Sequence, residues 1–311
     1  MKLTIAALRL CVLAAVLLPS SIARSAETKA GTNQKLVIAH RGASGYLPEH
    51  TLEAYALAYA QGADLIEPDV VLSRDGVLVC NHDIHMGPTT DVAERFPDRR
   101  RADGRYYFID FTVAELKTLA VKGRNDAAEP GYQIPTLAEM LAMIARLNER
   151  AGRAVGTIPE PKSPAWHREQ GQPIEAKLLE QYAALGYTRR TDPVIVQCFE
   201  LDSLRQMRND LKTDLRLVYL HGQSLDDRSL DELATFADGI GPSAKLIENN
   251  GQSIANNSLV RRAHERRLKV YPYTLGKDEA PTQRFFWTYD VDGLFSDFPD
   301  VAVRARAAGA P

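Results

Sequence analysis

Apolar runs of strand length alternate with amphipathic helical patterns along most of this 311-residue chain. Strands that alternate with helices favour a parallel sheet covered by helices. Roughly eight such units in one chain predict an α/β fold of the TIM type, a (β/α)8 barrel. We expect strands at 35–39, 64–70, 76–80, 155–160, 194–199, 215–220, 238–240, 269–274 and 293–296, and helices at 49–61, 137–150, 175–185, 202–210, 225–236, 259–267 and 282–289.

The predicted barrel is slightly irregular. The turn SRDG joins two expected strands and is too short for a crossover helix. Residues 83–135 hold no barrel-type strand and are too long for a loop, so we expect a small insertion at the barrel mouth. This insertion either shapes the substrate pocket as a lid or only extends the rim of the barrel. An open doubly wound sheet is the alternative fold, but RGASG after the first strand lacks the GxGxxG pattern.

The first residues have the features of a signal peptide. Lys2 and Arg9 precede an apolar stretch at 10–18, and small residues follow Pro19. The apolar stretch is much shorter than the ~20 residues that span a bilayer, although a retained N-terminal anchor is the alternative. We therefore expect a signal peptide at 1–26, a barrel domain at 27–311, no stable membrane insertion, and a periplasmic or secreted protein.

Charge and cysteine content further limit the classes of function that the sequence allows. The whole chain has a formal net charge of −2, and residues 1–26 contain three basic residues and no acid, so the mature chain is more acidic. No basic patch interleaved with aromatic residues indicates nucleic-acid binding. Alternation along the strands turns Cys80 inward and Cys198 outward, so a disulfide between them is not expected. Nothing in the sequence points to a particular oligomeric state.

Charged residues gather where expected strands end. His40 and His82 each close an apolar run, and Glu67 and Asp69, two apart, can point to one side of a strand. Glu160 closes another run. Three carboxylates with no cysteine among them form an oxygen-only site, which suits Ca²⁺ or Mg²⁺ better than Zn²⁺. Salt bridges from these acids to a nearby arginine are the structural alternative.

Two cations accompany these residues. Arg41 offers a planar fork that matches phosphate oxygens, and Lys162 offers a point charge. With two histidines available as base and acid, the set fits cleavage of a phosphodiester. Gln197 faces inward and can bind a ligand or a neighbouring carboxylate, while Phe199 either walls the pocket or belongs to the core. Asp83 either orients the imidazole of its neighbour or caps a loop, and His50 is expected to be structural.

At these residues the chain resembles the periplasmic glycerophosphodiester phosphodiesterases, which belong with the barrels of the phosphatidylinositol-phospholipase-C type. The resemblance lies in HRGASGYLPEHT, GADLIEPDVVLSRDG, VLVCNHD, TDVAERFPDRRRADGRYYFIDFT, GTIPEPKSP, VIVQCFE, VYPYT and DGLFSDFPD. It implies a TIM barrel that releases sn-glycerol 3-phosphate and an alcohol from a small glycerophosphodiester. In such enzymes a glycerol hydroxyl is thought to attack first and form a cyclic phosphate that water then opens.

The resemblance also implies roles for single residues. His40 and His82 match the acid/base pair, Arg41 a phosphate ligand and Lys162 a lysine near the phosphate. Glu67, Asp69 and Glu160 match the carboxylates that hold a divalent cation, usually Ca²⁺. Tyr273 stands where many relatives have a pocket-lining tryptophan. Pro161 replaces a more usual apolar residue and removes a backbone donor.

Two alternative functions stay open at this stage. A related phospholipase that acts on intact lipids needs an exposed apolar surface at the barrel mouth, and the polar insertion argues against one. A binding protein that captures phosphodiesters without cleaving them has no need of either histidine, yet His40 and His82 are both present beside a full set of carboxylates.

Overall fold

A computed structural model describes residues 34–87, 89–122 and 131–310. The expected signal peptide at 1–26 lies outside the described residues. Within these ranges, no helix is both long enough and apolar enough to cross a membrane.

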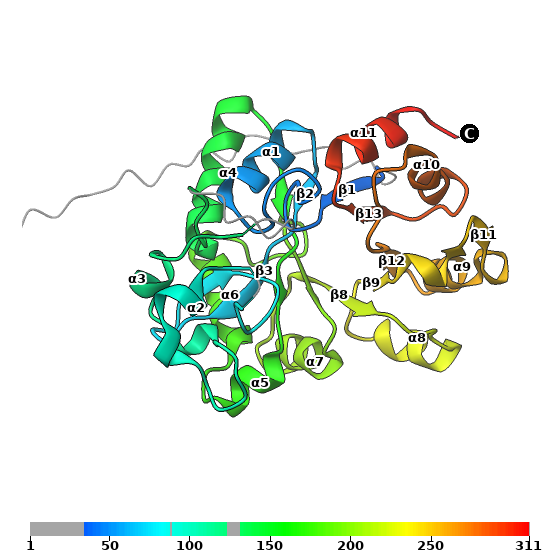
Figure 1. Ribbon diagram of the computed structural model, residues 1–311. Coiled ribbons are helices and arrows are strands. Elements are labelled where there is room, and N and C mark those ends of the chain that lie inside the picture. The colour runs from blue at the N-terminus through cyan, green and yellow to red at the C-terminus, as the bar shows by residue number, and fades with distance from the viewer. Residues whose placement is uncertain (1–33, 88, 123–130, 311) are drawn as a thin grey trace, which may run out of the picture. The chain divides into compact units, whose positions relative to one another are not determined.

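Parallel strands close into a barrel inside a layer of helices (Figure 1). In order around it they are β1 (Leu36–Ala39), β2 (Leu65–Ile66), β5 (Gly156–Thr157), β7 (Ile195–Cys198), β8 (Arg216–His221), β9 (Gly239–Pro242), β12 (Lys269–Val270) and β13 (Gly293–Ser296). β13 returns to pair with β1. Single bridges from Thr157 to Val194 and from Leu275 to Ser296 join the two halves. The predicted (β/α)8 barrel is confirmed, and the open sheet is wrong because the first and last strands pair.

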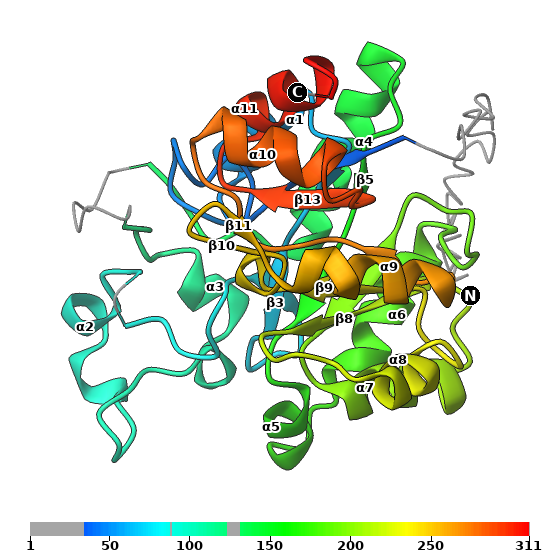
Figure 2. The same cartoon turned by 90° about the vertical axis from the view of Figure 1, so that its right-hand side faces the viewer.

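Helices cover the outside of this barrel, and Figure 2 shows several of them from a second side. They are α1 (Leu52–Ala60), α4 (Leu137–Ala151), α6 (Ile174–Ala184), α7 (Leu201–Asn209), α8 (Asp227–Leu233), α9 (Ser258–Glu265), α10 (Glu279–Trp287) and α11 (Pro299–Ala307). α1 begins three residues later than expected. The reason is that the side chain of Thr51 caps it by accepting from the backbone N–H of Ala54, while His50 before it has a non-helical φ of 59°.

Two strand predictions are each split by a proline. The expected strand 64–70 is β2 followed by β3 (Asp69–Leu72), and 155–160 is β5 followed by β6 (Glu160–Pro161). Pro68 and Pro159 lie at the breaks, where a residue without an N–H cannot continue the ladder. β3 pairs in parallel with β6, which sets Asp69 opposite Glu160. The breaks therefore bring carboxylates from two strands to one place.

β3 also forms an antiparallel hairpin with β4 (Leu78–Cys80), as the short SRDG turn predicts. Cys80 and Cys198 are buried free thiols, so the expectation of no disulfide between them is confirmed. A second hairpin, outside the barrel, joins β10 (Glu248–Asn249) to β11 (Gln252–Ser253) and was not predicted.

The described part of the insertion has an apolar core of its own. It contains α2 (Val92–Arg95), α3 (Val113–Leu116) and the 3-10 turns Pro97–Arg99 and Phe108–Asp110. Val71 and Val79 of the β3–β4 hairpin join residues such as Phe108 and Phe111 in this core. Tyr107 stacks on Trp166 of the short helix α5 (Pro164–Glu169), with ring centroids 5.4 Å apart. The insertion is thus attached both to the hairpin and to a helix that follows a site strand.

Candidate active site

Every residue that the sequence predicts for the site lines one pocket: His40, Arg41, Glu67, Asp69, His82, Glu160, Lys162, Gln197, Phe199 and Tyr273. Leu220, Thr274 and Phe295 complete its wall. These residues lie at or just after the carboxyl ends of their strands, the end at which (β/α)8 enzymes place their active sites. The pocket has a cavity volume of about 150 Å³ and opens to solvent.

The three carboxylates form the floor of the site. Glu67, Asp69 and Glu160 are at most 5% exposed, and each offers an oxygen within 4.8 Å of those of the other two. Oδ1 of Asp69 is buried and has no hydrogen-bond partner among the described residues. Buried carboxylates this close are costly unless a cation compensates them. Their oxygen-only chemistry, and an Asp69 oxygen without a hydrogen-bond partner among the described residues, fit a divalent cation.

The pKa values of the three acids reflect their burial and their closeness to one another. Burial and the neighbouring Asp69 raise the pKa of Glu67 well above its usual range. The same two causes raise the pKa of Glu160 to about 8. Burial acts to raise the pKa of Asp69 too, but Lys162, His50 and Arg41 outweigh it and hold that pKa well below its usual range. The pKa of Asp69 is therefore shifted in the opposite direction to those of Glu67 and Glu160.

The two cations stand beside these acids. The Arg41 backbone N–H donates to Oε2 of Glu67 at 2.6 Å, and Nη1 donates to Oε1 of Glu49 at 2.8 Å. Nζ of Lys162 donates to Oε1 of Glu160 at 2.7 Å and lies 3.7 Å from Oδ1 of Asp69. Salt bridges were the structural alternative for these acids, and such contacts are present. The bridged side chains line the pocket, however, so a bound phosphate can contact both cations.

Each of the two pocket histidines is held by a carboxylate. Nδ1 of His40 lies 2.7 Å from Oδ1 of Asp297, which also accepts from the hydroxyl of Ser44 at 2.9 Å. Nδ1 of His82 lies 3.0 Å from Oδ1 of Asp83. A carboxylate on Nδ1 fixes the ring and leaves Nε2 for the substrate. Of the two roles considered for Asp83, orientation of the imidazole is the one observed.

Sequence reasoning assigned no role to Asp297. The residue stands in the quoted motif DGLFSDFPD, directly after β13, and the pairing of β13 with β1 brings it to His40. An acid after the last strand of an expected closed barrel was an available signal, because that strand neighbours the first one.

Three further residues shape the upper wall. Nε2 of Gln197 donates to Oε1 of Glu67 at 3.4 Å, so it meets a neighbouring carboxylate, and its own Oε1 is buried without a partner in the described ranges. Phe199 is 44% exposed, which excludes a core role. Its ring meets Tyr273 edge to face at 5.5 Å, and Nζ of Lys162 lies 5.6 Å from its centroid. The exposed ring of Phe199 and the half-buried ring of Tyr273 provide an apolar surface next to the cation Lys162.

A cluster of three carboxylates and two imidazoles in one pocket of a (β/α)8 barrel is typical of a class of hydrolase that acts on anionic esters. Comparison with known proteins gives the family: the model of the glycerophosphoryl diester phosphodiesterase family matches residues 40–301. The chain belongs to this family.

Relatives and solved structures agree with this assignment. The chain is 34% identical to a glycerophosphodiester phosphodiesterase of Haemophilus influenzae, over 87% of this chain and 89% of that one. One from Treponema pallidum is 29% identical over 88% and 92%. A crystal structure of the Agrobacterium tumefaciens enzyme has a TM-score of 0.64 at 25% identity, covering 87% of this chain and 100% of that one. An Oleispira antarctica phosphodiesterase in complex with the product sn-glycerol-3-phosphate has the same fold, with a TM-score of 0.67 at 24% identity over 88% and 96%.

Proposed function

We propose that this protein hydrolyses small glycerophosphodiesters to sn-glycerol 3-phosphate and an alcohol, with a divalent cation and a pair of histidines. Membership of the phosphodiesterase family supports the reaction. The observation that carries the mechanism is the pair His40 and His82, both lining the pocket of the carboxylate cluster and both held at Nδ1. Only Nε2 of each ring is then left to exchange a proton with the substrate.

Different residues of the chain have different roles in the proposed reaction. One imidazole removes the proton from the attacking hydroxyl and the other protonates the leaving alkoxide, each typically worth about 10²–10⁴-fold in rate. Arg41 and Lys162 hold the phosphate oxygens, and the rings of Phe199 and Tyr273 bound the glycerol side of the pocket. Gln197 keeps Glu67 in place.

Glu67, Asp69 and Glu160 are the proposed ligands of the cation, which we assign as Ca²⁺, with Mg²⁺ the alternative. When bound, the ion supplies positive charge next to the phosphoryl oxygens. Ca²⁺ accepts six to eight oxygens in flexible geometry, whereas Mg²⁺ demands a near-ideal octahedron. Carboxylates from two broken strands, together with substrate and water oxygens, suit the more permissive ion.

Export to the periplasm or the medium is part of the proposal. The basic start and short apolar stretch of residues 1–26 support a cleaved signal peptide, which leaves one catalytic domain at 27–311. Fractionation of cells that express the full chain, with N-terminal sequencing of the product, tests this. A cytoplasmic, uncleaved product contradicts it.

The insertion at 83–135 is proposed to shape the substrate pocket rather than to pad the rim. His82, which lines the pocket, immediately precedes it, and Tyr107 within it stacks on Trp166 next to the site strand β6. Replacing Tyr107 by alanine loosens this attachment, and KM for the glycerophosphodiester is expected to rise. An unchanged KM in a folded variant contradicts the proposed role.

The activity itself is tested by release of glycerol 3-phosphate from glycerophosphocholine. We expect release that depends on Ca²⁺, stops with EDTA, and falls by at least about 10²-fold in His40→Ala. Unchanged turnover after EDTA or in the variant overturns the mechanism. Cleavage of intact phospholipid in place of the deacylated diester identifies a phospholipase, and substrate bound without turnover in a calorimeter identifies a binding protein.

A further inference from the structure

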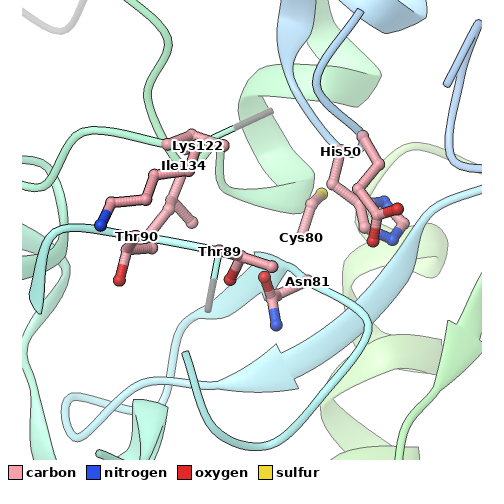
Figure 3. Close-up of a pocket in the computed structure, with 9 residues that line it drawn as sticks. His50, Cys80, Asn81, Thr89, Thr90, Lys122 and Ile134 are labelled. Carbon is pink, nitrogen blue, oxygen red and sulfur yellow. The ribbon is translucent and has the colours of Figure 1, made fainter. Parts of the chain in front are cut away.

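His50 is a buried histidine that uses both of its ring nitrogens. Nε2 lies 3.0 Å from Oδ2 of Asp69, and Nδ1 lies 2.8 Å from the hydroxyl of Tyr55 on α1. Only 3% of the His50 side chain is exposed. His50 also borders a narrow hollow beneath the insertion, which Cys80 and Thr90 help to line (Figure 3). The imidazole thus connects a barrel helix to one ligand of the proposed cation site.

The partners of His50 hold the ring on both sides. A carboxylate oxygen only accepts hydrogen bonds, so the Nε2–H of His50 donates to Asp69. The hydroxyl of Tyr55 lies 2.8 Å from Nδ1 on the other side of the ring. The series Tyr55, His50, Asp69 therefore forms a continuous chain of polar contacts.

The two oxygens of Asp69 have different surroundings. Oδ2 accepts from His50 and lies 3.4 Å from Nε of Arg41. Oδ1 has no hydrogen-bond partner in the part of the chain that the structure describes, and the ammonium of Lys162 lies 3.7 Å from it. A carboxylate that is held firmly through one oxygen presents the other in a fixed direction.

We propose that His50 is a positioning residue for divalent-cation binding: it holds Oδ2 of Asp69 and so directs Oδ1 toward the cation. The inference rests on the proposed cation site and adds a residue to which the proposed mechanism gives no role. Partners of this kind orient metal ligands, and their loss typically weakens metal affinity about 10–100-fold.

The backbone supports this assignment. His50 has a φ of 59°, in the left-handed region that favours glycine, and its N–H donates to the carbonyl of Arg41 at 3.1 Å. Thr51, the next residue, caps α1. Conformations of this kind persist where the surrounding structure fixes them, and they concentrate at functional sites. Here the conformation places the ring behind Asp69.

Calcium titration calorimetry on EDTA-stripped protein tests the proposal. His50→Leu removes the donor at similar volume, and we expect its Kd for Ca²⁺ to be about 10–100-fold above that of wild type. His50→Gln keeps an N–H donor at the end of the side chain and is expected to recover most of the affinity. At saturating Ca²⁺, kcat is expected to change much less than Kd. A wild-type Kd in folded His50→Leu overturns the proposal.

His167→Leu is the matched control. It removes another fully buried histidine, one whose ring nitrogens have no hydrogen-bond partner among the described residues. Its Kd is expected to equal that of wild type. Urea unfolding of each variant in EDTA separates a loss of stability from a loss of affinity, since a purely structural His50 changes only the first.

A second variant covers failure of His50→Leu to fold. Tyr55→Phe removes the hydroxyl that holds Nδ1 of His50, and a Kd raised several-fold is expected; an unchanged Kd then overturns the proposal. Failure of the proposed cation site looks different from either result, because wild type itself then binds no Ca²⁺.

Discussion

Nδ1 of His40 lies 2.7 Å from Oδ1 of Asp297, although 257 positions separate the two residues in the chain. The first strand of the barrel ends just before His40 and the last ends just before Asp297, and β1 pairs with β13 in parallel register. Closure of the barrel is therefore what assembles this histidine–carboxylate pair. The hydroxyl of Ser44 holds the same carboxylate oxygen from the loop after β1.

Asp297→Asn tests the role of the Asp297–His40 pair in catalysis. The amide keeps the volume but loses the charged oxygen that holds Nδ1 of His40. We expect kcat to fall by at least about 10²-fold, by analogy with general-base histidines that lose their orienting carboxylate. KM and the Ca²⁺ Kd are expected to change much less than kcat, since Asp297 lies against Nδ1 of His40 and accepts from the hydroxyl of Ser44. Steady-state kinetics and calorimetry on one preparation measure all three, and an unchanged kcat contradicts the role.

Arg41→Lys tests whether the planar guanidinium of Arg41 binds the phosphate. Arg41 is held in place by Glu49 and Asp69, and these acids, opposed by burial, raise the pKa of its guanidinium. Lysine keeps the charge but not the planar pair of donors. Hydrogen bonds to charged groups contribute about 1.5–3 kcal/mol each, so kcat/KM is expected to fall roughly 10–100-fold. Competition by glycerol 3-phosphate is expected to weaken in parallel; inhibition of wild-type strength places the phosphate elsewhere.

The sequence predicts most of this site because its residues follow strand ends, and a barrel gathers strand ends at one rim. Glu67, Asp69 and Glu160 were predictable in this way, although the strand breaks beside them were not. Pro68 and Pro159 were visible signals of those breaks, but the apolar runs around them suggested continuous strands.

Residues that contact the pocket-lining side chains without lining the pocket themselves were harder to predict. Asp297 depends on which strands become neighbours, and His50 depends on a left-handed backbone turn that no local pattern indicates. Helix α11 was missed despite the signals at its ends. Pro299 stands at its first position, and Arg304 and Arg306 lie in its last turn.

Removal of the metal is expected to lower stability as well as activity. An ion that binds the folded state alone adds about 2.7 kcal/mol at one hundred times its Kd, so saturating Ca²⁺ is expected to raise the Tm of EDTA-stripped protein by several degrees. Glu67→Gln removes one of three negative ligands while its side-chain oxygen can still accept from the backbone of Arg41. We expect this variant to lose the Ca²⁺-dependent Tm shift but keep a Tm near wild type in EDTA. A full shift in Glu67→Gln removes it from the ligand set.

Stability at acid pH is expected to depend on His167. Its ring is fully buried in α5, and burial lowers its pKa to about 4 from an ordinary value of 6.5. Below pH 6.5 the unfolded chain binds a proton that the folded protein refuses, so stability falls as the pH drops from about 6.5 to about 4. The full contribution of this one group is about 3 kcal/mol.

His167→Leu removes that penalty. The free energy of unfolding in urea, measured at pH 7.5, 6 and 5, is expected to decline less steeply for the variant than for wild type. At pH 7.5 the variant is expected to be at least as stable, because leucine removes two buried ring nitrogens that lack partners among the described residues. Parallel pH profiles for the two proteins contradict the assignment, since all other titrating groups are shared and cancel in the comparison.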